Sequence, residues 1–141
     1  MVTKQTVFRG TNKAVRLILN LLKYIIPSIF IMKILEHSGW LLKISDFFAP
    51  YMAYIGLPGE GALVLMFGQV TIFSGVAAMT ILNLTAKQLT IMCTVMSISH
   101  VLVLETAIIT KSGANGLLNA ASRIAASAVT GFVLNLIIPG V

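Results

Sequence analysis

Three polar side chains that could do chemistry lie inside a long apolar segment near the middle of the chain. Residues 89–110 match the roughly 20 residues that a helix needs to cross a bilayer, yet they include Ser97, His100 and Glu105, with Ser99 beside His100. An acidic residue at the centre of such a helix costs about 2.5 to 3.5 kcal/mol, so residues of this kind usually face an interior site or path. The chain has only four acidic residues in all. We therefore predict that these three side chains contact a solute or a coupling ion.

His100 and Glu105 cannot point to one place on a straight helix. Five residues along an α-helix correspond to about 140° around its axis. Two interpretations remain open. Either the helix is broken between Ser97 and Val101 and both side chains reach one site, or the helix is straight and Glu105 serves another neighbour, such as Arg123 in the next apolar segment. His100 is equally compatible with a structural, hydrogen-bonded role.

Three further polar residues stand where predicted helices begin or pack. Glu60 lies in the sequence GLPGEG, a chain break beside a helix start, where the dipole favours negative charge; it is either a simple cap or a carboxylate that faces a ligand or ion. Gln69 borders a face of small residues suited to helix packing, and its amide needs a hydrogen-bonding partner. Asn115 could supply a neutral hydrogen bond. The predicted solute- or ion-binding residues are Glu60, Gln69, Ser97, His100, Glu105 and Asn115.

Composition places these residues in a membrane protein. Hydrophobic residues make up 57% of the chain and charged residues 10%, whereas a soluble domain carries about 25% charged residues. We expect a multi-pass protein of the cell (inner or plasma) membrane. The net charge of +6 comes from basic residues that flank apolar segments, a pattern that sets orientation and attracts anionic lipid. We therefore expect membrane lipid as a partner, no nucleic acid, and a cytoplasmic N-terminus.

The elements that must position the polar residues are helices. We predict an all-α, polytopic single domain over residues 1–141, with about four transmembrane helices and a broken or re-entrant helical element. The re-entrant element is expected around residues 50–61, within an aromatic-rich segment with two prolines; an ordinary short loop is the alternative. The four spans are expected at residues 14–35, 61–82, 89–110 and 117–138.

The first of these spans has two interpretations. Arg16, Asn20, Lys23 and Pro27 recur at spacings of four, three and four, which places them on one helix face. A helix that lies on the membrane surface shows such a stripe. The alternative, which we favour, is a span kinked at Pro27, with Lys23 reaching toward the cytoplasmic interface.

Several kinds of chemistry are not indicated. Cys93 and His100 are too few for a structural zinc site, which needs four ligands. Ser97, His100 and Glu105 are the residue types of a catalytic triad, but they lie along one helix and do not converge on a reaction centre. We therefore expect no enzyme activity, no metal and no cofactor.

Two stretches of the chain resemble a known family. The run GLPGEGALVLMFG, and the later run from LTAKQL through SISHVLVLETAIITKSGANG, resemble the nucleoside-recognition or Gate domain of prokaryotic membrane proteins. That family includes small spore-maturation-type proteins and the membrane domain of ferrous iron transport protein B, with a distant likeness to concentrative nucleoside transporters. The resemblance extends from about Lys13 to the end of the chain.

The resemblance implies a function and an assembly. Gate domains occur in pairs, so it implies that this chain is one half of a pseudo-symmetric paired unit, and transport sites of this kind form between inverted repeats. The implied function is a subunit of a membrane transporter or permease for an unidentified small polar solute, such as a nucleoside-like molecule. The implied partner is a second copy in an antiparallel homodimer, or a sister Gate-domain protein in a heterodimer. The alternative is a non-transporting membrane interaction or scaffold protein, as in spore maturation.

Overall fold

The computed structural model describes residues 4–139, and every regular element in that range is a helix. The prediction of one domain over residues 1–141 extends beyond the described residues at both ends. The helices are α1 (Lys4–His37), α2 (Trp40–Ala53), α3 (Gly61–Val70), α4 (Ile72–Met79), α5 (Ala86–Ser99), α6 (Leu102–Lys111) and α7 (Gly116–Ile137).

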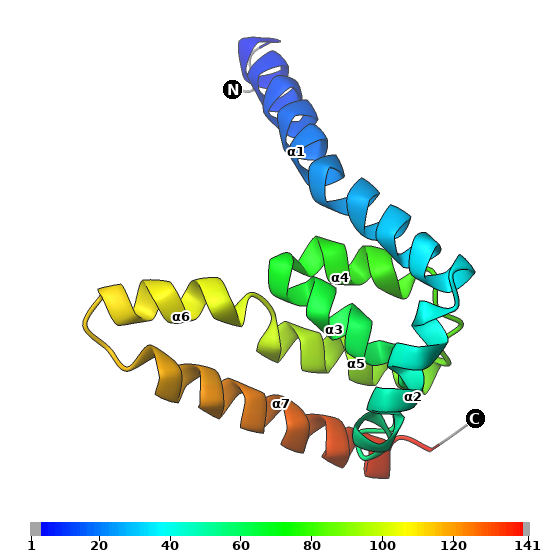
Figure 1. Ribbon diagram of the computed structural model, residues 1–141. Helices are drawn as coiled ribbons and strands as arrows, with labels where there is room; N and C mark the ends of the chain where they lie inside the picture. Colours follow the sequence, from blue (N-terminus) through cyan, green and yellow to red (C-terminus); the bar gives the residue numbers. More distant parts are fainter. Residues whose placement is uncertain (1–3, 140–141) are drawn as a thin grey trace.

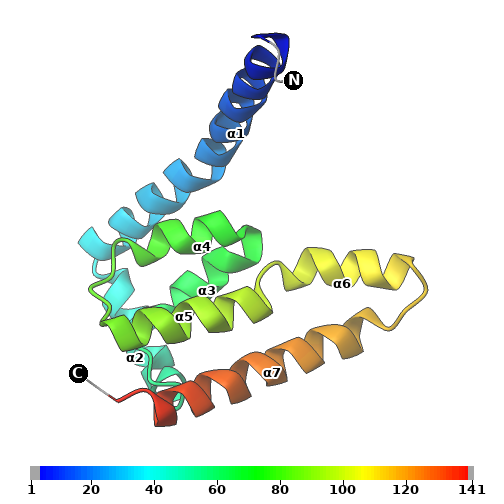
Figure 2. The ribbon, with the colours of Figure 1, turned by 180° about the vertical axis from the view of Figure 1, so that it is seen from behind.

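Three stretches are long and apolar enough to cross a membrane. They are Gln5–His37 in α1, Ala86–Lys111 in α5 and α6 together, and Gly116–Ile137 in α7. α7 runs back along α5 and α6 as an antiparallel partner (Figures 1 and 2). The all-α, polytopic fold class is therefore confirmed.

The span predicted at residues 61–82 is not a single helix, and this part of the prediction is wrong. Thr71 takes an extended conformation between α3 and α4, and its hydroxyl accepts a hydrogen bond from the Ser74 amide to begin α4. The chain thereby turns back, and α3 and α4 pack as a short helical hairpin (Figure 1). Gly68 and Gly75 face each other across this hairpin: a Cβ on Gly75 would lie 3.1 Å from the Gly68 Cα. The predicted small-residue face is therefore used inside one hairpin.

The aromatic-rich segment before the hairpin is helical at first. α2 continues through Pro50, and the turns that follow it carry the chain to Glu60 at the start of α3. Trp40, Phe47 and Tyr51 are exposed on α2. A helical element is thus present, while its depth relative to a membrane stays a prediction.

The buried core joins the hairpin to α5 and to the C-terminal half of α1. Met32, Val64, Ala78, Ile91 and Met92 are fully enclosed there. α1 continues through Pro27 as one helix, and its N-terminal half reaches away from the other helices in both views (Figures 1 and 2). The core therefore packs the two helices of the hairpin against α5 and the C-terminal half of α1.

Candidate functional site

The membrane-length segment formed by α5 and α6 is broken at His100 and Val101. α5 ends at Ser99 and α6 begins at Leu102. Val101 has a φ of 53°, and among the described residues it is the one non-glycine with a positive φ. Such a conformation is strained for a β-branched residue, at a cost of order 1 to 3 kcal/mol. The break that the first of the two interpretations required, between Ser97 and Val101, is present.

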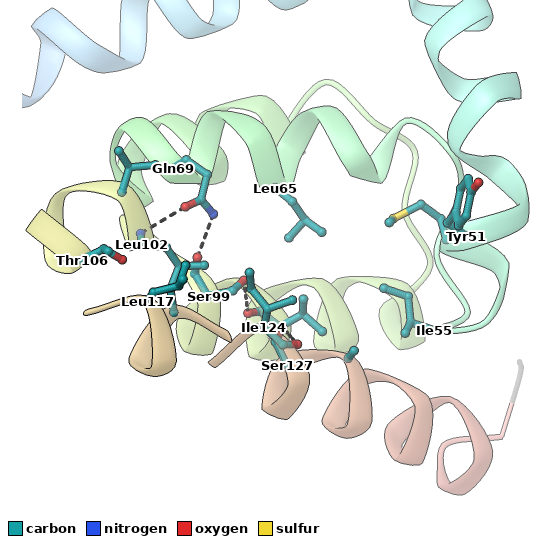
Figure 3. Close-up of a pocket in the computed structure, with 15 residues that line it drawn as sticks. Tyr51, Ile55, Leu65, Gln69, Ser99, Leu102, Thr106, Leu117, Ile124 and Ser127 are labelled. Atoms are coloured by element: carbon teal, nitrogen blue, oxygen red, sulfur yellow. Dashed lines mark hydrogen bonds between the residues drawn. The ribbon is translucent and has the colours of Figure 1, made fainter. Parts of the chain in front are cut away.

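Residues at the end of α3 form hydrogen bonds with the backbone groups that this break leaves without helical partners. Gln69 Nε2 donates a hydrogen bond of 2.7 Å to the Ser99 carbonyl, and Gln69 Oε1 accepts one of 3.1 Å from the Leu102 amide. The Val101 amide donates to the Gly68 carbonyl at 3.2 Å. Both bonds of the Gln69 amide are visible in Figure 3. Because helix ends leave amides and carbonyls without partners, and these are costly in an apolar environment, this contact makes the break possible.

A second contact reaches the break from α7. Arg123 Nε donates to the Ile98 carbonyl at 2.7 Å, and the same guanidinium forms an ion pair with the Glu105 carboxylate. Glu105 lies in the first turn of α6, where the helix dipole favours a negative charge. The suggested Glu105–Arg123 pair is therefore present as well, so the two interpretations are both partly correct.

His100 is held locally at the end of α5. Its ring Nδ1 lies 3.0 Å from the Ser97 carbonyl, and because a carbonyl can only accept, this nitrogen donates. The hydrogen-bonded, structural role predicted as one alternative is present. Among the described residues, no hydrogen bond or ion pair joins His100 to Glu105.

A pocket of about 700 Å³ opens beside the break (Figure 3). Its polar lining comes from four side chains of α3, α5, α6 and α7, with Tyr51 of α2 at one end. Apolar residues such as Leu65, Leu102 and Ile124 supply most of the remaining wall. The four polar side chains are Gln69, Ser99, Thr106 and Ser127. The pocket is therefore mainly apolar with a few hydrogen-bonding groups, as small-molecule sites usually are.

Only Gln69 of the six predicted site residues lines this pocket. Ser97 is exposed and donates to the Cys93 carbonyl. Asn115 begins α7, where its side chain accepts a hydrogen bond from the Leu118 amide. Glu60 stands at the start of α3 without a side-chain capping bond, and lies in a separate hollow of about 320 Å³ with Glu36. The structure does not bring the six together, and their contact with a solute stays a prediction.

Three hydroxyl residues of the pocket were not among the predicted site residues. Ser99 and Thr106 are direct neighbours of His100 and Glu105 in the two motifs SH and ET. At a helix break the direction of each side chain depends on backbone angles, so the neighbour of a predicted residue can be the one that faces inward. Ser127 is a buried serine among alanines. A serine in such a setting usually serves helix packing, so it is a weak indication of a binding site.

Comparison with known proteins places the chain in a family. The model of the Gate family, described as nucleoside recognition, matches residues 18–139. The chain belongs to the Gate family. The match includes the α3–α4 hairpin, the break and α7, so these features lie within the Gate domain itself.

A curated relative is a membrane protein of a bacterium. The chain is 31% identical over 119 residues to the uncharacterized membrane protein YvoD of Bacillus subtilis (strain 168). The aligned part covers 82% of this chain but only 37% of that relative. No solved structure matches the chain. With the three membrane-length stretches, the family and the relative identify a multi-pass membrane protein.

Proposed function

We propose that this Gate protein is a subunit of a membrane transporter for a small polar solute, and that the pocket beside the α5–α6 break binds the solute. The observation that carries the proposal is the break itself, held by Gln69 next to a cavity of about 700 Å³. Irregular backbone at membrane depth is tolerated only where it is buried in protein or lines a water-filled cavity. Many transporters build their solute sites from such discontinuous helices.

The free hydrogen-bonding capacity of the pocket suggests what kind of solute it takes. Ser99 and Ser127 donate their hydroxyl hydrogens to the carbonyls of Val95 and Ile124. Each oxygen therefore keeps a lone pair that can accept a bond from a solute N–H or O–H. The Thr106 carbonyl accepts a bond from Thr110, but the Thr106 hydroxyl has no partner among the described residues and can donate to a solute. A solute with an apolar ring and several donors, as in a nucleoside, fits this arrangement.

We further propose that two chains form the working unit, either as an antiparallel homodimer or with a sister Gate-domain protein. The alignment leaves most of the YvoD relative unmatched, so that relative has room for a second domain in one chain. Transport sites commonly lie between two inverted repeats, and this chain supplies one. Crosslinking in native membranes tests the pairing: we expect a dimer-sized species, and a monomer at every protein concentration would contradict the proposal.

The alternative function is a membrane scaffold, and one observation favours it. Glu105, Gln69 and Asn115 all make bonds that stabilise the fold. In a scaffold, Glu105→Gln and His100→Ala would lower the melting temperature, and the protein would bind no solute. In a transporter, a solute should raise the melting temperature of the wild-type protein.

A binding measurement with two matched variants tests the proposed site. Ala120 lines the pocket, whereas its neighbour Ala121 is exposed and does not. We expect uridine, adenosine or another polar solute from a panel to raise the melting temperature of the wild type and of Ala121→Phe. Ala120→Phe should lose this shift, because the phenyl ring projects into the pocket and competes with the solute for space. Equal shifts in both variants would place the binding site elsewhere.

A further inference from the structure

The N-terminal half of α1 does not pack against the other helices. Every side chain from Gln5 to Asn20 is exposed, and this half of the helix points away from the other helices (Figures 1 and 2). α1 has 34 residues, so it is about 51 Å long at about 1.5 Å per residue. The hydrocarbon core of a bilayer is about 30 Å thick. Residues 24–37 of α1 are about 21 Å long at the same rise, so an α1 whose residues 5–23 lie at the membrane surface does not cross the bilayer.

The exposed half of α1 has one basic and one apolar face. At about 100° per residue, its four described cations fall within an arc of about 80°. The opposite arc carries large apolar side chains that are exposed, including Val7, Ile18 and Leu22. The four cations are Arg9, Lys13, Arg16 and Lys23. A helix of this kind lies in the interface plane of a membrane.

The cations gather around one surface hollow. Arg9, Lys13 and Arg16, with Phe8 and Asn12, line a hollow of about 420 Å³. A guanidinium presents a planar set of donors that matches a phosphate group. Phe8 lies between the basic arc and the centre of the apolar face. A phospholipid carries phosphate oxygens next to acyl chains. Its phosphate could bind the cations while its acyl chains contact Phe8.

A second copy of this chain offers little to match these cations. The first acidic residue is Glu36, which pairs with Lys33, and Glu105 pairs with Arg123. Two carboxylates then remain, Asp46 and Glu60. Charge complementarity therefore favours a lipid surface over a copy of the chain.

We propose that residues 5–23 of α1 lie in the headgroup layer of an anionic phospholipid leaflet. The basic face contacts lipid phosphates, and the apolar face lies in the boundary with the acyl chains. Near a surface of this kind each Lys or Arg favours the bound form about fivefold. The segment thereby anchors the start of α1 beside the helical core, independently of any transported solute.

Two labelled positions on the full chain test this placement. In a Cys93→Ala background, Ile18→Cys puts a nitroxide on the apolar face, and Asn20→Cys puts one on the basic face. The protein is placed in vesicles of phosphatidylcholine with phosphatidylglycerol. We expect the label at residue 18 to collide mainly with oxygen, and the label at residue 20 mainly with a water-soluble nickel complex. The difference between the two labels in their collision rates with oxygen and nickel should shrink severalfold in pure phosphatidylcholine. It should shrink likewise at about 1 M salt, where the Debye length is about 3 Å.

Charge variants separate lipid recognition from net charge. Arg9→Gln with Arg16→Gln should remove most of the dependence on phosphatidylglycerol. Lys43→Gln with Lys111→Gln removes the same charge from other exposed parts of the chain and should leave the dependence intact. The proposal is overturned if both labels are water-exposed, if both lie in the acyl region as in a simple span, or if both are shielded from oxygen and nickel as in a protein contact. Equal behaviour in both lipid mixtures would also overturn it.

Discussion

Gln69 is the residue on which the broken helix most depends. Its amide group bonds a carbonyl at the end of α5 and an amide at the start of α6, so one side chain completes two backbone groups that belong to different helices. Asparagine is one methylene shorter, and leucine has neither polar atom, so neither can reproduce this pair of bonds. The tip of the α3–α4 hairpin and the break therefore form one unit.

Replacing Gln69 by leucine should destabilise the protein strongly. Two half-buried backbone groups would lose their partners, at about 1 to 3 kcal/mol each, so we expect a loss of about 3 kcal/mol. The measurement is the free energy of unfolding in an SDS titration, followed by the fluorescence of the single tryptophan. Asn119→Leu, on α7, is the control and should change little. A Gln69→Leu protein as stable as the control would show that water replaces the lost bonds.

Arg123 and Glu105 should behave as a coupled pair. We expect a coupling free energy of about 1 kcal/mol in a double-mutant cycle with Arg123→Gln and Glu105→Gln, since both side chains are partly exposed. Arg123→Gln should cost more than Glu105→Gln, because it also removes the bond to the Ile98 carbonyl. The same unfolding titration measures all four proteins. Additive effects would mean that the ion pair contributes nothing to stability.

At the scale of the helices, two positions allow the chain to depart from straight spans. Thr71 reverses the chain between α3 and α4, and Val101 redirects it between α5 and α6. Neither is a glycine or a proline. The hairpin closes because Gly68 and Gly75 let the two backbones approach, and the break persists because its polar groups have partners.

A glycine at residue 101 should be tolerated. Val101→Gly removes the strain of a β-branched residue at positive φ, and this gain offsets the added freedom of the unfolded chain. We expect stability equal to or above that of the wild type. Ala107→Gly, in the interior of α6 and exposed, should instead cost about 1 kcal/mol. Equal losses in the two variants would show that Val101 packing outweighs its strain.

A methyl group at Gly75 should open the hairpin. Its Cβ would collide with the Met96 sulfur and press on the Gly68 backbone, so Gly75→Ala should cost about 1 to 3 kcal/mol. Gly10→Ala is the matched control, because nothing lies within 4 Å of that Cβ; alanine in a helix should stabilise by up to about 1 kcal/mol. Opposite signs are expected in the unfolding titration. A stable Gly75→Ala protein would contradict the close packing of α3 on α4.

The helices that lie within one apolar run were predictable, and the interruptions were less so. The span expected at residues 117–138 is α7 within one residue at each end. The apolar run at residues 61–82 is long enough for a membrane span. Hydropathy measures only how apolar a run is, so it cannot predict that the chain turns back at Thr71. The break at Val101 was one of two alternatives, because a straight helix holds His100 and Glu105 about 140° apart and only a break could bring both to one site. The Gln69 contact was beyond prediction, since its partners are backbone atoms that exist only once the break forms.

At the scale of the whole molecule, the chain is a membrane Gate domain whose helices converge on one open pocket. α3, the broken segment and α7 line it together with α2. α1 stands apart from this assembly over its N-terminal half. The proposed second chain would complete the unit around the pocket, and the proposed lipid contact would hold α1 at the membrane surface.

Solute counterflow in reconstituted vesicles tests the central claim most directly. Vesicles that contain the protein are loaded with the solute identified by binding, and the entry of the same labelled solute is followed. The wild type and Ala121→Phe should accumulate label above protein-free vesicles, and Ala120→Phe should lose most of that uptake because its ring projects into the pocket. Uptake by Ala120→Phe equal to that of Ala121→Phe, or no uptake by the wild type, would contradict a solute site at the broken helix.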